Sequence, residues 1–301
     1  MSNLYDVIII GGGPAGLTSA VYARRAGKSV LVIEKATFGG QITWSPRVEN
    51  YPTIVSASGA EIGDLMLSQA MEQGADVELE EVVSLEDRGE TKLISCESGA
   101  EFEARTVIIA TGAKPRMLGL PKEEELIGNG VCFCAVCDGA FYAGKTVAVN
   151  GGGNSALQDA MLLSEKCKKV YLIHRRDSFR GEAKLVEALE KKENVEFLLG
   201  VSITALLEED DGLTGLELSN GISLPVDGLF VAIGHRPQNE IFASSIALNE
   251  QGYADSSEDC LTKSQGIFVA GDCRKKSVRQ LTTAVADGAT AALAAVSYLD
   301  S

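Results

Sequence analysis

Short apolar runs that end in glycine recur along this chain, and segments with a helical spacing of apolar residues follow them. Residues 5–16 read YDVIIIGGGPAG and residues 145–156 read KTVAVNGGGNSA, an offset of 140 positions (145 − 5). A continuous apolar run bounded by a glycine turn is typical of a strand buried on both faces of a parallel sheet. Both segments therefore predict a strand, a glycine turn and the start of a helix.

The elements expected after the two turns also match each other. Helices are expected at about Pro14–Ala26 and Asn154–Lys166, and a buried strand follows each of them, at Ser29–Glu34 and Lys169–His174. Strand–helix–strand units of this kind build parallel sheets with helices packed on their faces. We therefore predict an α/β fold with two Rossmann-like dinucleotide-binding domains of the three-layer ββα type, the second inserted into the first.

Two proline-containing segments mark the expected crossings between the domains, near 113–118 and near 236–246. We expect residues 1–113 and 245–301 to form one discontinuous domain and residues 114–244 to form the other. Pro115 and Pro237 lie in the two short linkers. Paired linkers of this kind are expected to serve as a hinge.

Composition narrows the classes of function. The chain has 301 residues, 45% of them hydrophobic and 23% charged, as in ordinary globular proteins. Its formal charge of −15 argues against nucleic acid or an anionic membrane as a partner. Seven irregularly spaced cysteines indicate a reducing compartment, and no apolar run approaches the ~20 residues of a membrane span. We expect a cytoplasmic protein without a secretory signal.

The glycine turns follow the dinucleotide-binding pattern G-x-G-x-x-G or G-x-G-x-x-A. Glycines let the backbone approach a pyrophosphate, and the helix N-terminus offers free N–H groups and the positive end of its dipole. The candidate ligands are Gly11, Gly13, Pro14, Ala15 and Gly16 in the first copy, and Gly151, Gly153, Asn154, Ser155 and Ala156 in the second.

The two copies differ where the second strand ends. Glu34 ends it in the first copy, where a carboxylate accepts hydrogen bonds from ribose hydroxyls and repels a 2′-phosphate, which suits FAD or NAD. The second copy reads HRRDSFR at 174–180, and its arginines favour NADPH because guanidinium groups bind phosphate. The candidates at these strand ends are Glu34 and Lys35 in the first copy, and His174, Arg175, Arg176 and Arg180 in the second.

Later strands are expected to return to the ligands. ATGA (110–113) and AIGH (232–235) each close an apolar run, which makes Thr111 and Gly112, and Ile233 and Gly234, candidate contacts. A further strand in GIFVAGDC (266–273) ends at Gly271-Asp272. An acid at the carboxyl end of such a strand can accept hydrogen bonds from a polyol, such as the ribityl chain of a flavin.

Three cysteines crowd into VCFCAVCDGAFY, at positions 132, 134 and 137. A metal site would lack an obvious fourth protein ligand, so no metal is expected. Buried thiols that act only as small hydrophobes are a second reading. The favoured reading is a redox-active pair, Cys134 and Cys137, because a Cys-x-x-Cys spacing lowers a thiol pKa, with Asp138 carrying a proton. All three readings remain open at this point.

The whole set of motifs closely resembles the low-molecular-weight thioredoxin reductases. The resemblance covers essentially the whole chain, and the motifs come in the same order as in that family. They are GGGPAG (11–16), GGQ (39–41), VENYP (48–52), ATGA (110–113), CAVCDGAFY (134–142), GGGNSA (151–156), HRRDSFR (174–180), AIGHRP (232–237), AGD (270–272) and RQ (279–280).

This resemblance implies a homodimeric FAD enzyme that uses NADPH to reduce thioredoxin. It implies a redox disulfide Cys134–Cys137 in the NADPH domain, with Cys137 facing the flavin, Cys134 attacking thioredoxin and Asp138 as acid and base. It also implies rotation of one domain on the other. The FAD contacts that it adds are Gly40, Gln41, Asn50, Asp272, Arg279, Gln280 and the Leu281 backbone.

The sequence departs from the family pattern at a few positions. Cys132 stands where a small polar residue is common, and on an extended segment it shares a face with Cys134, which allows an alternative disulfide. The other departures are Trp44, Pro46 and Arg47 near the flavin, Asn150 before the second glycine turn, and Cys273 after Asp272.

Two other functions keep part of this pattern. One is a thioredoxin reductase whose flavin takes electrons from ferredoxin, and the other is a flavin- or thiol-based redox sensor without catalysis. The retained arginines count against the first, and the extra Cys132 motivates the second.

Overall fold

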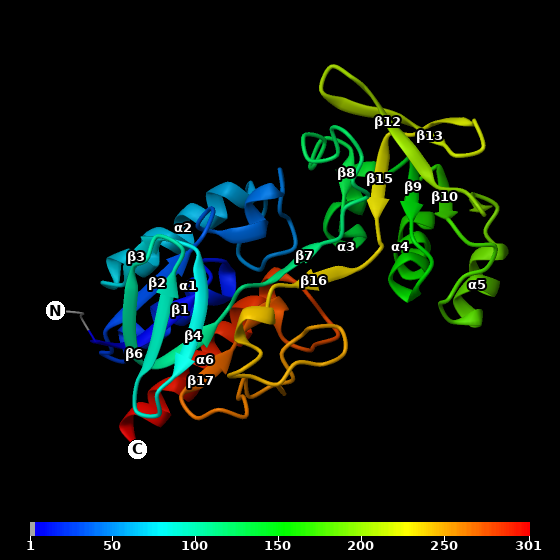
Figure 1. Cartoon of the computed structure of the whole chain (residues 1–301). Coiled ribbons are helices and arrows are strands. Elements are labelled where there is room, and N and C mark those ends of the chain that lie inside the picture. Colours follow the sequence, from blue (N-terminus) through cyan, green and yellow to red (C-terminus); the bar gives the residue numbers. More distant parts are fainter. Residues whose placement is uncertain (1–3) are drawn as a thin grey trace. The chain divides into compact units, whose positions relative to one another are not determined.

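The computed structural model describes residues 4–301, which divide into two compact units (Figure 1). The first unit contains the residues up to Lys114 together with Arg236–Ser301, and the second contains Pro115–His235. The chain crosses from one unit to the other in β7 (Ala113–Pro115) and β16 (His235–Pro237), which pair as a two-stranded sheet.

The second crossing lies earlier in the chain than the sequence predicted. Residues 236–244 were expected in the inserted domain, whereas the structure places them in the first unit. The reason is Phe242, at the end of η3 (Glu240–Phe242), which is fully buried in an apolar cluster of that unit. The buried Asn239 amide also donates to the backbone oxygens of Gly252 and Cys273, at 3.0 and 2.8 Å.

The first unit is built on one mixed sheet in the order β3–β2–β1–β6–β5–β4, with β17 also paired to β6. The neighbours β3, β2, β1, β6 and β17 run parallel, whereas β4 and β5 form an antiparallel extension. The strands are β1 (Leu4–Ile10), β2 (Val30–Glu34), β3 (Asp76–Leu79), β4 (Val82–Asp87), β5 (Lys92–Cys96), β6 (Glu101–Ile109) and β17 (Ile267–Val269).

Alternate residues of β1 enter two different cores. Val7 and Ile9 face the helices α1 (Pro14–Arg25), α2 (Gly59–Glu72) and α6 (Leu281–Asp300). Ile8 and Ile10 pack instead with apolar residues of β4 and β5. Both faces of β1 are therefore buried, which accounts for its uninterrupted apolar run. Figure 1 shows α1 and α6 together on the sheet.

The second unit repeats this layering. Its parallel sheet has the order β11–β10–β9–β15–β8, with helices on one face and the antiparallel sheet β12–β13–β14 supplying apolar residues on the other. The strands are β8 (Val131–Cys132), β9 (Thr146–Asn150), β10 (Lys169–His174), β11 (Val195–Leu199), β12 (Ile203–Glu209), β13 (Gly212–Leu218), β14 (Ser223–Pro225) and β15 (Gly228–Val231). The helices of this unit are α3 (Ala135–Asp138), α4 (Asn154–Ser164) and α5 (Ala183–Glu190), with the 3-10 turn η2 (Gly139–Tyr142). The first unit also contains the 3-10 turns η1 (Gly40–Trp44) and η4 (Gly271–Cys273).

The predicted α/β fold with two Rossmann-like domains is confirmed. α1 and α4 begin at the expected residues, and β10 has the expected bounds. The offset of the two copies extends to backbone bonds: Gly11 N–H donates to Ile33 at 2.8 Å, and Gly151 N–H donates to Ile173 at 3.0 Å. Within residues 4–301, no helix has both the length and the apolar content needed to cross a membrane.

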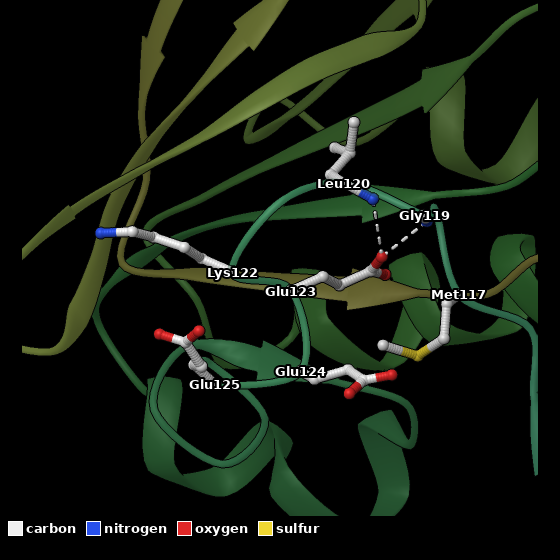
Figure 2. Close-up of a pocket in the computed structure, with 7 residues that line it drawn as sticks. All are labelled: Met117, Gly119, Leu120, Lys122, Glu123, Glu124 and Glu125. Carbon is white, nitrogen blue, oxygen red and sulfur yellow. Dashed lines mark hydrogen bonds between the residues drawn. The ribbon is translucent and has the colours of Figure 1, made fainter.

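The segment that enters the second unit is fixed around Glu123 (Figure 2). The carboxylate is 2% exposed and accepts backbone N–H groups of Leu118, Gly119 and Leu120, at 2.8, 2.8 and 3.3 Å. A shallow pocket beside it is lined by Lys122 and further acidic residues. None of the candidate site residues lines this pocket. The role of Glu123 is structural, because its carboxylate fixes the backbone of residues 118–120.

Candidate active site

The first glycine turn is shaped by the close approach of two backbone segments. Gly11 has φ +112°, and a Cβ there would lie 2.4 Å from the Ala110 oxygen. The heavy atom nearest to a Cβ placed on Gly13 would lie 3.9 Å away, so there is free space beside this residue. The turn is therefore closed toward the sheet and open at the start of α1, as a pyrophosphate site requires.

Glu34 is bound to this turn. One carboxylate oxygen accepts the Gly12 N–H at 2.7 Å, and the other accepts the Ala36 N–H at 2.9 Å. Each oxygen keeps a second acceptor position for a ribose hydroxyl. Lys35, the neighbouring candidate, is exposed and forms an ion pair with Glu81 at 3.2 Å.

Asp272 lies beside the same turn, because a Cβ on its neighbour Gly271 would come within 2.9 Å of the Ala15 Cβ. Its Oδ1 is buried and has no hydrogen-bond partner among the described residues. Burial raises the pKa of Asp272, although Lys276 and Arg279 oppose the shift. A buried carboxylate oxygen without a protein partner fits a hydroxyl of a bound polyol, so this site fits a flavin.

A buried ion cluster that the sequence did not reveal holds the Asp272 turn. Asp287 accepts the Gly271 N–H at 2.9 Å, two Arg274 bonds at 2.8 Å each and a Lys276 bond at 2.9 Å. Arg274 is 1% exposed, whereas residues 274–276 look like a surface basic cluster in the sequence. Burial favours a raised Asp287 pKa, but the bonds from Arg274 and Lys276 lower it.

Other predicted flavin contacts form smaller groups in the first unit. The Asn50 amide donates to the Gln280 side chain at 3.3 Å, and the Gln41 amide donates to the Ala113 oxygen at 3.1 Å, beside Gly112. Two of the remaining candidates begin an element, Gly40 in η1 and Leu281 in α6. Thr111 follows β6, and its hydroxyl forms a hydrogen bond with the Asn239 side chain. The Arg279 guanidinium lies 4.3 Å from the centroid of the Tyr253 ring.

The second glycine turn is built like the first. A Cβ on Gly151 would lie 2.4 Å from the Ala232 oxygen, and one on Gly153 would meet no atom within 4 Å. His174 takes the place of Glu34 under the turn, because its ring carbon lies 2.3 Å from a Cβ placed on Gly152. Burial lowers the pKa of His174, and the positive charges of Arg180, Arg176 and Arg175 lower it further.

The three arginines lie in the loop that follows β10. The Arg180 N–H donates to the Gly152 oxygen at 2.7 Å, which ties this loop to the glycine turn. The side chains of Arg175, Arg176 and Arg180 are exposed, and no hydrogen bond or ion pair engages them within residues 4–301. Unengaged guanidinium groups beside an open glycine turn fit a phosphorylated dinucleotide.

The other candidates of this unit are arranged around the same turn. Ser155 and Ala156 follow Asn154 in the first turn of α4, and the Asn154 side chain accepts the Glu182 N–H at 2.7 Å. Ile233 and Gly234 follow β15, where the Gly234 oxygen accepts the Arg116 N–H at 2.9 Å. Asn150 ends β9, and its backbone oxygen accepts the Ala232 N–H at 2.8 Å.

Cys134 and Cys137 form a disulfide at the start of α3. The Cys134 sulfur also accepts the Cys137 N–H at 3.2 Å. The other two thiols singled out in the sequence are buried: Cys132 lies near Tyr142, and Cys273 donates to the Ile109 and Ala270 oxygens. Cys132 therefore takes no part in a disulfide with Cys134.

Asp138 is half-buried at the end of α3, directly after the disulfide. Burial raises the pKa of its carboxyl to about 6, while a hydrogen bond with the Cys132 side chain opposes the shift. A carboxyl with this pKa can hold or release a proton close to neutral pH. Among residues 4–301, no group of three His, Cys, Asp or Glu side chains is arranged to hold a metal ion.

Comparisons with known proteins agree with this arrangement. Residues 5–288 match the family described as pyridine nucleotide-disulphide oxidoreductase. The thioredoxin reductase of Bacillus subtilis (strain 168) is 40% identical over 303 residues, covering 99% of this chain and 96% of that protein. The solved structure of thioredoxin reductase from Streptococcus pyogenes MGAS5005 has a TM-score of 0.94 at 35% identity, and the match covers 100% of this chain and 99% of that one.

A more distant relative has the same fold. Thioredoxin reductase from Giardia duodenalis matches with a TM-score of 0.91 at 32% identity, covering 99% of this chain and 100% of that one. The likeness therefore spans both units, the two glycine turns and the segment with the disulfide. This chain belongs to the thioredoxin reductases, within the pyridine nucleotide-disulphide oxidoreductase family.

Proposed function

We propose that this protein passes electrons from NADPH through FAD and the Cys134–Cys137 disulfide to thioredoxin or a thioredoxin-like protein. The observation that carries the proposal is the disulfide itself, followed directly by a carboxyl whose pKa burial raises to about 6. A purely structural disulfide needs no such carboxyl. Disulfide exchange does, because each cycle releases and takes up protons.

The two glycine turns divide the cofactors between the units. In the first unit, Glu34, the open Gly13 position and the unpartnered Asp272 oxygen support FAD. In the second, the open Gly153 position and the arginine loop support NADPH. When bound, the nicotinamide supplies a hydride and the flavin passes its two electrons to a disulfide.

The protein's own side chains carry out the exchange with the acceptor. The Cys134 thiolate attacks one sulfur of the acceptor disulfide; that bond breaks, and the second acceptor sulfur leaves and takes a proton. The Cys137 thiolate then attacks Cys134, which restores the disulfide and releases the acceptor dithiol. Two electrons and two protons are transferred, and Asp138 holds and donates a proton beside Cys137.

Replacing either cysteine of the disulfide tests this proposal. Cys134→Ser and Cys137→Ser should reduce NADPH-dependent thioredoxin reduction to background, while NADPH still bleaches the flavin absorbance of the holoenzyme. Cys167→Ser is the matched control, because Cys167 is a free, buried thiol of the same unit. Thioredoxin reduction at the control's rate in both mutants would refute the proposed route.

The choice of donor has its own test. Replacing Arg175 and Arg176 with glutamine should raise the KM for NADPH by about 10- to 100-fold, since charge-assisted hydrogen bonds are worth about 1.5–3 kcal/mol. The KM for NADH should hardly change. Lys166→Gln removes a charge from an exposed residue of the same unit and should leave both values unchanged. Bleaching of the flavin by reduced ferredoxin but not by NADPH would favour the ferredoxin-dependent alternative.

The homodimer and the cytoplasmic location stay predictions from resemblance and composition. Light scattering on the purified holoenzyme tests the first, with twice the chain mass of 31.7 kDa as the expected result.

A further inference from the structure

The loop that carries the three arginines, residues 175–182 between β10 and α5, returns to the second glycine turn through one pair of side chains. The Asn154 Oδ1 accepts the backbone N–H of Glu182 at 2.7 Å, and the Asn154 Nδ2 donates to the Glu182 Oε1 at 3.1 Å. Asn154 is the first residue of α4, directly after the open Gly153 position. These two bonds therefore join the arginine loop to the start of the helix, and the proposed function gives Glu182 no role.

The loop approaches α4 too closely at Gly181 for a side chain to fit without movement. A Cβ on Gly181 would lie 2.4 Å from the Leu157 Cδ1 and 2.9 Å from the Asn154 Oδ1. Leu157 is fully buried in an apolar cluster of the second unit, so it offers the loop a fixed surface. The glycine therefore brings Glu182 within hydrogen-bond distance of Asn154.

Other contacts fix the backbone of the loop and leave its guanidinium groups unengaged. The Arg176 oxygen accepts the Gly200 N–H at 3.1 Å, and the Arg180 N–H donates to the glycine turn. The Phe179 ring stacks on the His174 ring with 5.8 Å between the ring centroids. These contacts use backbone groups or an apolar ring, whereas the arginine side chains are exposed. The loop is thus a fixed frame that carries free cationic groups.

A fixed frame matters for a ligand that must reach two places at once. A dinucleotide with a 2′-phosphate places its pyrophosphate at the glycine turn and its additional phosphate at the arginines. A dinucleotide without that phosphate needs only the glycine turn. Holding the two binding elements together before the ligand arrives lowers the cost of ordering them on binding. This benefit falls mainly to the phosphorylated dinucleotide.

We propose that Glu182 is a positioning residue, which fixes the arginine loop to the glycine turn through Asn154 and so sets the preference for NADPH over NADH. This inference rests on the proposed function, which assigns NADPH to the second unit. The Glu182 carboxylate itself repels a bound phosphate, so its contribution comes from the hydrogen bond and not from the charge.

Titration calorimetry of the oxidised holoenzyme with NADP⁺ and NAD⁺ tests the inference, because neither ligand is turned over. Glu182→Ala should raise the Kd for NADP⁺ by about 3- to 10-fold, as expected for one lost hydrogen bond, and the Kd for NAD⁺ by less than about twofold. Glu182→Gln keeps an acceptor oxygen for Asn154 and removes the charge. Its Kd for NADP⁺ should equal that of the unmodified protein or fall below it.

A double-mutant cycle shows whether Glu182 acts through Asn154. Asn154→Ala should weaken NADP⁺ binding, and adding Glu182→Ala to it should have little further effect, because the bond is already lost. The matched control is Glu190→Ala, which removes an exposed carboxylate from the other end of α5. It should leave both Kd values unchanged. In turnover, Glu182→Ala should raise the KM for NADPH and leave kcat at saturation unchanged.

An unchanged Kd for NADP⁺ in Glu182→Ala, equal losses in Glu182→Ala and Glu182→Gln, or additive effects in the cycle would each overturn the inference. If the unmodified protein prefers NADP⁺ and Glu182→Ala keeps that preference, only the inference falls. If the unmodified holoenzyme binds NADP⁺ no more tightly than NAD⁺, the donor assignment in the proposed function is wrong, and the inference falls with it.

Discussion

Asp138 shows, at the scale of one residue, how burial and local bonding compete. The sequence places it beside Cys137, but its proton affinity depends on its surroundings. Burial raises the pKa of the carboxyl from 3.8 to about 6, and the Cys132 bond opposes that shift. The raised pKa suits the proton transfer that we propose for Asp138, and it also means that the charged form of this carboxyl costs stability in the folded protein.

This cost gives a prediction for stability against pH. Because the folded-state pKa is raised, the penalty is absent below about pH 4, grows as the pH rises toward 6, and is complete above that. Asp138→Asn should therefore be more stable than the unmodified protein by about 1–2 kcal/mol at pH 8 and equally stable at pH 4. Denaturant unfolding at both pH values measures the difference.

The control for this prediction is Glu187→Gln, which neutralises an exposed carboxylate on α5. It should change stability little at either pH. If Asp138→Asn were destabilised at pH 8, a favourable interaction of the ionised carboxylate would have to outweigh its burial.

At the scale of elements, the two glycine turns repeat one backbone arrangement with different side chains beneath it. Equivalent backbone bonds hold both turns, and equivalent open positions lie at Gly13 and Gly153. The side chain beneath the turn differs, with Glu34 under one and His174 under the other. In the proposed function, the backbone provides the general dinucleotide site, and the neighbouring side chains select the nucleotide.

Two glycines with positive φ allow the cost of a steric clash to be measured apart from the cost of a strained backbone conformation. Gly11 has φ +112° and a Cβ position 2.4 Å from a backbone oxygen, whereas Gly27, after α1, has φ +78° and no atom within 4 Å. Gly27→Ala should cost only about 1 kcal/mol of strain. Gly11→Ala should lower the free energy of unfolding by about 3 kcal/mol or more, because the backbone atoms that the new Cβ would meet cannot move aside. It should also lower the amount of FAD that the protein binds.

Denaturant unfolding and the ratio of flavin to protein absorbance measure both effects. Equal costs for the two substitutions would mean that the contact between Gly11 and Ala110 contributes nothing beyond the backbone conformation.

At the scale of the whole molecule, each unit has its own pair of cores. The clusters around Val7 and Ile8 belong to the first unit, and those around Val147 and Ala148 belong to the second. Each unit thus buries its own apolar residues on both faces of its own sheet. This division predicts that the units unfold separately.

Calorimetry tests the division directly. The full chain should show two transitions, one raised by added FAD and the other by NADP⁺. A ligand at about 1,000 times its Kd stabilises its own unit by roughly 4 kcal/mol. Residues 115–235 expressed alone should reproduce the NADP⁺-sensitive transition without binding FAD. One transition raised equally by both ligands would contradict independent units.

Local sequence patterns were sufficient to predict much of the fold and part of the candidate site. The repeated apolar runs, glycine turns and helix starts predicted the α/β fold, and the Cys-x-x-Cys spacing predicted the redox pair. These features can be read from the sequence because they involve residues close along the chain, whose spacing reflects the backbone geometry of strands, turns and helices. The placement of residues 236–244 was wrong, because the burial of Phe242 depends on a core formed by distant segments.

The sequence by itself determined the two dinucleotide-binding units and the cysteine pair that precedes the second glycine turn. Only the tertiary structure decided that Arg274 and Asp287 are buried partners, that Asp272 has an unpartnered oxygen, and that burial raises the pKa of Asp138. The physical reason is that hydrogen bonding and desolvation depend on which groups folding brings together in space. Sequence spacing does not encode these neighbours when they come from separate strands, helices and turns.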